Sequence, residues 1–176
     1  MIAVRAQEKL DFELPIRGGI TAGTGHRPPK LGGYRPEVTN ALYRMARTWL
    51  TEQRPGCVIS GMALGWDQAL AMAAYDVGIP FHAYVPFKGQ ESTWPQESRD
   101  MHHMLLKRAA RIVHVCEPGY AAWKMQRRNE AMVDACTHVL ALWDGSSGGT
   151  ENCVKYAEKK RKPIINLWAI WKGDRQ

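Results

Sequence analysis

Three glycine-bearing segments of the chain contain residue types that bind anions. They are residues 23–27 (Gly-Thr-Gly-His-Arg), 60–67 and 144–151. Each segment follows an apolar run typical of a strand and precedes a run typical of a helix. Glycine lets backbone N–H groups approach an anion closely, and the helix that follows contributes the positive end of its dipole. The three segments together predict a site for a phosphate or a nucleotide.

In the first two segments, polar side chains stand beside the glycines. The hydroxyl of Thr24 and the side chains of His26 and Arg27 suit a phosphate or a ribose; the alternative is a tight loop with surface charges. Asp67 lies in the first turn of a predicted helix, where it could bind a ribose or interact with the helix dipole. The ligand-binding residues expected here are Gly23, Thr24, Gly25, His26, Arg27, Ser60, Gly61, Gly65 and Asp67.

The third segment gives the clearest indication of a phosphate site. Its glycines and Thr150 offer backbone amides and a hydroxyl to one phosphate group at a helix start, while Asp144 could bind a sugar or stabilise the turn. On the preceding predicted helix, one of two adjacent arginines is expected to reach the cleft and the other to be solvated. This part of the site comprises Arg128, Asn129, Asp144, Gly148, Gly149 and Thr150. Trp66 and Trp94 are the tryptophans expected to stack on a ligand.

Acidic residues near these segments could support catalysis. Cleavage of a glycosidic bond needs a carboxylate that stabilises positive charge on the sugar. The candidates are Asp67, Glu130, Asp144 and Glu151. For Glu151 the alternative is ordinary dipole complementarity in the first turn of a helix.

The segments are positioned by alternating strands and helices. Strands are predicted at 16–22, 57–59, 81–85, 112–115, 138–143 and 163–167, and helices at 36–53, 66–77, 95–110, 120–135 and 149–160. This alternation predicts an α/β fold, three-layered and Rossmann-like, with a mostly parallel sheet flanked by helices. We expect one domain over 16–176, preceded by an N-terminal extension over 1–15.

Composition narrows the class of protein. The 176 residues carry a formal net charge of +7, which favours an anionic partner, although a basic surface is common in soluble proteins. No apolar stretch approaches the roughly 20 residues of a membrane span, so we expect a cytoplasmic protein without membrane contact. The four cysteines and six histidines lack metal-ligand spacing, so no metal and no certain cofactor is predicted.

Residues 24–28 and 60–67 resemble the YpsA-like branch of the SLOG superfamily of Rossmann-like nucleotide-binding domains, and the resemblance extends over 20–167. The second segment and the Arg128-Asn129 pair also resemble DprA, the DNA-processing protein. Met125, Arg128 and Met132 resemble positions in the LOG phosphoribohydrolases. LOG enzymes have a further glycine before the threonine, a lysine where this chain has Asn129, and their catalytic glutamate where it has Cys153. The resemblance also implies a homo-oligomer.

Three functions follow from these observations. The leading hypothesis is a sensor or sequestering protein that binds a nucleotide or an NAD-derived ligand. The second is a nucleotide N-glycosidase. The third is a DprA-like module for single-stranded DNA, ranked last because the cations are dispersed along the sequence instead of alternating with aromatic residues.

Overall fold

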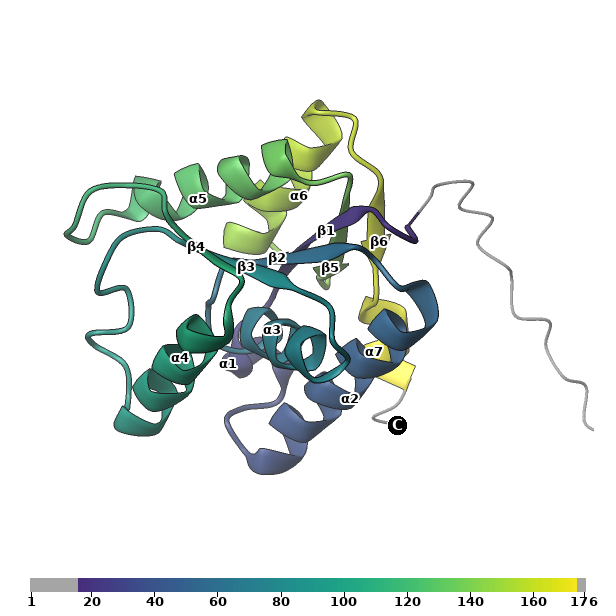
Figure 1. The fold of residues 1–176 in the computed structure, drawn as a ribbon, viewed down its shortest axis with the longest axis horizontal. Coiled ribbons are helices and arrows are strands. Elements are labelled where there is room, and N and C mark those ends of the chain that lie inside the picture. Colours follow the sequence, from purple (N-terminus) through teal and green to yellow (C-terminus); the bar gives the residue numbers. More distant parts are fainter. Residues whose placement is uncertain (1–15, 174–176) are drawn as a thin grey trace, which may run out of the picture.

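A computed structural model describes residues 16–173, so the predicted extension over 1–15 lies outside the described residues. Strands and helices alternate through the described chain (Figure 1). The elements are β1 (Ile20–Gly25), α1 (Pro28–Leu31), α2 (Pro36–Gln53), β2 (Cys57–Ser60), α3 (Trp66–Asp76), β3 (Phe81–Val85), α4 (Gln96–Arg108), β4 (Arg111–His114), α5 (Ala122–Ala135), β5 (His138–Leu142), α6 (Gly149–Lys159), β6 (Ile164–Asn166) and α7 (Trp168–Gly173). The division of the chain at residue 16 stays a prediction.

The strands form one parallel sheet of six in the order β4-β3-β2-β1-β5-β6. Helices α5 and α6 cover one face, and α1 to α4 with α7 cover the other (Figure 1). The predicted three-layer, Rossmann-like α/β fold is therefore confirmed. After β4 at one edge, the chain returns to place β5 on the free side of β1. In such sheets, ligands bind where the strand order reverses, outside the carboxyl ends of the strands; here that point lies between β1 and β5.

The core lies on both faces of the sheet. Toward α2 and α3, apolar side chains such as Leu50, Trp66 and Leu70 pack against the strands. Toward α5 and α6, the core includes Met132 and Cys153. All five residues of β5 are buried, as expected for a central parallel strand covered on both sides. The sheet ends next to the predicted site are therefore held by a packed frame.

One local prediction was wrong, and two short helices were not predicted. The first strand was expected at 16–22, but β1 runs from Ile20 to Gly25, because Gly18 adopts a positive φ of 79° in a turn. The Gly-Thr-Gly run therefore lies inside the strand instead of in a loop. The short helices α1 and α7 were not predicted, since four and six residues are too few to show a helical period.

Candidate functional site

A cavity of about 380 Å³ lies at the switch point of the sheet. It is enclosed by the segment after β1, the segment before α3, helix α5 and the start of α6. Its lining residues are Thr24, Gly25, His26, Arg27, Pro29, Lys30, Ala63, Asp67, Met125, Arg128, Asn129, Ser147, Gly148, Gly149 and Thr150. Three of these carry a positive side chain and one a carboxyl group.

The N-terminus of α6 faces this cavity without a side-chain cap. Gly148 is the N-cap residue and offers no capping side chain; the Glu151 carboxylate accepts a bond from the Gly148 backbone, which leaves the next amides, of Gly149 and Thr150, without a side-chain cap. The φ of Gly148 is 143°, a conformation that favours glycine. A methyl group added at Gly148 or Gly149 would meet no atom within 4 Å, so neither glycine is required by packing at that position. The amides of this turn and the nearby hydroxyl of Thr150 are available to an anion.

Arg128 and Asn129 form the wall opposite α6, and both are buried. Arg128 donates one hydrogen bond to the carbonyl of Gly61 and another, of 3.0 Å, to Asn129 Oδ1. Asn129 Nδ2 in turn lies 3.3 Å from the carbonyl of Gly149. These contacts link α5 to the segment before α3 and to the start of α6. As the sequence suggested for the arginine pair, Arg128 enters the cleft while Arg127 is exposed.

Asp67 is the carboxyl group in the cavity wall, and it is 5% exposed. Burial raises its pKa to about 6, although the charge of Arg128 and the amide of Ala63, 3.4 Å from Oδ2, favour the ionised form. Gly61 leaves room for this arrangement, because an added Cβ there would lie 2.8 Å from Asp67 Oδ2 and closer still to Arg128. The buried pair thus forms a fixed floor for the cavity.

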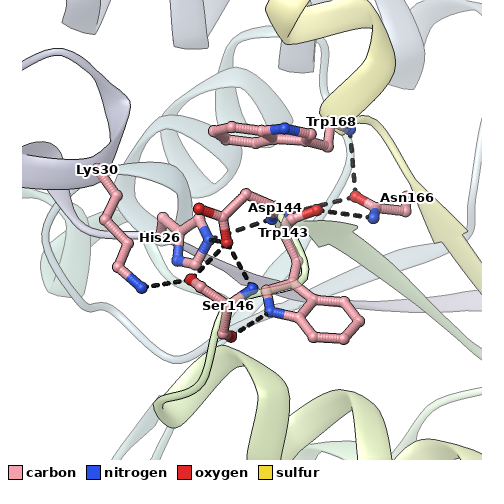
Figure 2. Close-up of polar contacts among 7 residues, drawn as sticks. All are labelled: His26, Lys30, Trp143, Asp144, Ser146, Asn166 and Trp168. Atoms are coloured by element: carbon pink, nitrogen blue, oxygen red, sulfur yellow. Dashed lines mark hydrogen bonds and ion pairs between the residues drawn. The ribbon is translucent and has the colours of Figure 1, made fainter.

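A second polar cluster ties the segment after β1 to the β5–α6 loop, which comprises residues 143–148 (Figure 2). His26 Nε2 lies 2.6 Å from Asp144 Oδ1. The same oxygen accepts hydrogen bonds from the backbone N–H and the hydroxyl of Ser146. The bonds from Ser146 and from His26 hold the pKa of Asp144 well below its usual value. Lys30 reaches across from α1 and donates to the Ser146 hydroxyl.

Ten of the fifteen residues expected to bind ligand line the cavity. The other five are Gly23, Ser60, Gly61, Gly65 and Asp144, and their contacts are internal. Ser60 bonds the backbone of Met62 and Asp67, and Asp144 bonds His26 and Ser146. Gly65 has a φ of 91° and lies where an added Cβ would be 2.8 Å from the carbonyl of His26.

The other catalytic candidates do not line the cavity, and two of them pair with a cation. Glu130 pairs with Arg127 at 3.5 Å, and Glu151 pairs with Lys155 at 2.7 Å. Glu151 also accepts a bond from the backbone of Gly148, which lowers its pKa together with the stronger effect of Lys155. Glu151 is therefore placed to stabilise the first turn of α6. Of the four candidates, Asp67 alone lines the cavity.

Sequence reasoning also misplaced one residue and missed several. Trp66 is fully buried in the core, so it cannot stack on a ligand. The lining residues absent from the predicted set are Pro29, Lys30, Ala63, Met125 and Ser147. The positive charge of Lys30 was a possible indication of an anion site. Its position at the cavity, however, depends on its hydrogen bond to Ser146, 116 residues away. Cys153, for which the resemblance implied the place of the LOG glutamate, is buried, and burial raises the pKa of its thiol to about 11.

Two further properties concern the described residues. Over 16–173, no group of three or more His, Cys, Asp or Glu side chains is arranged to hold a metal ion. None of the helices in that range combines the length and the apolar character that crossing a membrane would require.

Comparison with known proteins identifies the family. The YpsA family model, described as the YspA SLOG family, matches residues 23–169. The chain belongs to this SLOG family. It is 32% identical over 140 residues to the uncharacterized SPbeta prophage-derived protein YoqJ of Bacillus subtilis, covering 70% of this chain and 81% of YoqJ.

Solved structures share the fold of this SLOG protein. DprA from Streptococcus pneumoniae superposes with a TM-score of 0.60 at 17% identity, covering 86% of this chain. The chain spans about half of that protein, 51% of its length. A molybdenum cofactor binding protein from Rippkaea orientalis gives a TM-score of 0.55 at 16% identity, over 86% of this chain and 77% of its own. At these identities the likeness concerns the fold.

Proposed function

We propose that this SLOG protein binds a nucleotide or an NAD-derived phosphorylated ligand in the switch-point cavity, as a sensor or a sequestering protein. The observation that carries the proposal is the uncapped N-terminus of α6, which faces a cavity lined by Arg27, Lys30 and Arg128. Free amides, a helix dipole and nearby cations together favour a phosphate. A volume of about 380 Å³ falls within the range of roughly 300–1,000 Å³ typical of small-molecule sites.

The cavity offers different chemistry to the two ends of such a ligand. The phosphate would lie at the start of α6, against Gly148, on the amide of Gly149 and on the amide and hydroxyl of Thr150. The sugar would lie toward Thr24 and Asp67, whose oxygen atoms can bond its hydroxyl groups. Arg128 and Asn129 would close the cleft from the side of α5.

The substitution Thr150→Asp tests this placement. A second anion at the start of α6 would repel the phosphate, while an acidic residue in a first helical turn preserves the fold. We expect ligand binding to be abolished. Asn152→Asp is the matched control, because it adds the same charge in the same helix at an exposed position outside the cavity lining. Calorimetric titration with nucleoside monophosphates, NAD and ADP-ribose gives the affinities; unchanged affinity in Thr150→Asp with intact circular dichroism excludes this phosphate site.

The geometry of Asp67 favours an N-glycosidase as the alternative function. Above its pKa of about 6, Asp67 is mostly ionised at neutral pH and could stabilise positive charge at the sugar carbon as the base leaves and water adds. This function predicts base release over many turnovers, followed by mass spectrometry. Release should be lost in Asp67→Asn with ligand binding retained; recovery of intact ligand alone supports the sensor.

A hollow beside the cavity is the observation that favours a nucleic-acid partner. It has a volume of about 970 Å³, and the exposed side chains of Lys88, Trp123 and Arg127 are among its lining residues. Trp123 is 63% exposed, so cations and an aromatic ring that are dispersed in the sequence meet on this surface. Single-stranded binding proteins combine the same features. This function predicts oligonucleotide affinity that falls steeply with salt and that Trp123→Ala weakens.

A further inference from the structure

We propose that His26 and Asp144 are positioning residues that set the geometry of the phosphate-binding turn at the start of α6. This inference rests on the proposed function, because it concerns how the same cavity recognises phosphate. Neither residue is assigned a chemical step. Their role is to fix the β5–α6 loop, which leads directly into Gly148 and Gly149.

The first half of this loop is held by a dense set of hydrogen bonds (Figure 2). Asn166 at the end of β6 accepts from the backbone N–H of Trp143 at 3.1 Å and donates to its carbonyl at 2.8 Å. The indole Nε1 of Trp143 donates to the carbonyl of Ser146 at 2.8 Å. Two donors of Ser146 converge on Asp144 Oδ1, and His26 Nε2 lies 2.6 Å from the same oxygen and 3.2 Å from the Asp144 backbone nitrogen. Asp144 is thus the common hydrogen-bond acceptor of this turn.

His26 connects this turn to the wall of the cavity. Its side chain lines the cavity and is itself buried, and its ring meets the Trp168 ring edge-on at 5.7 Å between centroids. Lys30 makes a parallel link to Ser146, but Lys30 is an exposed side chain, and such long side chains lose entropy when they hold one geometry. The link between β1 and the β5–α6 loop that has a buried partner is therefore the His26–Asp144 pair, in which the His26 ring is buried and Asp144 is exposed.

This arrangement affects the two ends of a ligand unequally. Breaking the pair loosens the loop that leads to Gly148 and to the amides of Gly149 and Thr150, so phosphate recognition is weakened. The sugar side depends on Asp67, which is held by Arg128 and by the segment before α3. A positioning role therefore predicts a selective loss of phosphate affinity, whereas general damage to the cavity would weaken both ends.

The experiment compares His26→Asn, Asp144→Asn and the double variant with the wild-type chain. His103→Asn is the matched control, because it removes another histidine–carboxylate bond, to Glu91 at 2.8 Å, outside the cavity lining. Calorimetry gives the affinity for whichever of the four common ribonucleoside 5′-monophosphates binds most tightly, and for its nucleoside. Hydrogen–deuterium exchange follows the backbone amides of 145–150 without ligand, and circular dichroism checks the fold.

We expect each single variant to weaken nucleotide binding about tenfold or more, the loss typical of a hydrogen bond to a charged group, with nucleoside affinity unchanged. The double variant should lose little more than either single one, and exchange at 145–150 should accelerate. Equal losses for nucleotide and nucleoside, or unchanged nucleotide affinity, would overturn the inference. If the wild-type chain binds no nucleotide, the proposed function fails by itself, and exchange rates that stay unchanged in both single variants refute the positioning role independently.

Discussion

Substitution by alanine at two glycines of the candidate site should have opposite effects on stability and on ligand binding. Gly25 ends β1, and an added Cβ would lie 2.5 Å from Cδ1 and 2.7 Å from Cβ and Cγ of Trp66. Gly149 begins α6, and an added Cβ would meet nothing within 4 Å. Both glycines line the cavity. Gly25→Ala therefore tests packing, and Gly149→Ala tests ligand approach.

The expected magnitudes follow from these contacts. Real Cβ atoms do not approach other atoms within 3.0 Å, so Gly25→Ala must displace Trp66 or β1. Trp66 is fully buried and has little room to move. Overpacking a tight core costs roughly 1–3 kcal/mol, and three close contacts place this case near about 3 kcal/mol. For a chain of this size, that loss lowers Tm by about 6–12 °C. Gly149→Ala should leave stability unchanged or raise it by up to about 1 kcal/mol, because alanine is the better helix former.

Urea unfolding measures the stability of the two variants, and calorimetric titration measures their nucleotide affinity. Gly149→Ala should retain the wild-type unfolding free energy and lose nucleotide affinity, because its methyl group projects where a phosphate would lie. Gly25→Ala should unfold at a lower urea concentration with an unchanged m-value. A Gly25→Ala variant as stable as the wild type would refute the packing argument. A Gly149→Ala variant with full affinity would refute the close approach of phosphate to this turn.

Two further predictions concern ionisable groups near the cavity. Because the pKa of Asp67 is raised to about 6 from 3.8, its protonated form favours the folded state, so its stabilising contribution is complete below pH 4 and is lost as the pH rises through 6. The difference in unfolding free energy between the wild type and Asp67→Asn should therefore change between pH 4 and 7, measured by urea titration, and a constant difference would contradict the shift. Cys153 should resist iodoacetamide at pH 8 in the native state, because it is buried and its thiol pKa is about 11; mass spectrometry showing rapid modification would contradict that burial.

Much of the fold could be predicted because its signals are local. Apolar runs marked five strands within a few residues, and Pro36 marked the start of α2, where the structure places it. The predicted start of β1 was wrong. Two glycines near residue 18 weaken any strand prediction, and the Gly-Thr-Gly run was interpreted as a turn. That run can be a strand because residues 140–142 of β5 pair with it, and the local sequence does not indicate this pairing.

The site was predictable in location but not in the roles of its residues. Glycines in the three segments look equivalent in the sequence, yet Gly61 makes room for Arg128 while Gly149 opens to the cavity. Likewise, Asp144 and Glu151 are both acids beside glycines, but their partners make them structural. Which neighbour each residue meets depends on tertiary packing between segments more than 60 residues apart. Residue type and spacing alone do not determine that neighbour.

The buried Arg128–Asp67 pair changes how the charge of a bound phosphate would be balanced. The charges of Arg128 and Asp67 attract each other, but burial opposes the ionisation of both side chains, and Arg128 also donates a hydrogen bond to the carbonyl of Gly61. Arg128 is therefore better suited to shaping the cavity floor than to neutralising a ligand. The remaining positive charge comes from Arg27 and Lys30, which are exposed at the cavity, and from the dipole of α6. A site built in this way holds its geometry with the buried side chains of Asp67 and Arg128 and attracts its anion with the exposed side chains of Arg27 and Lys30.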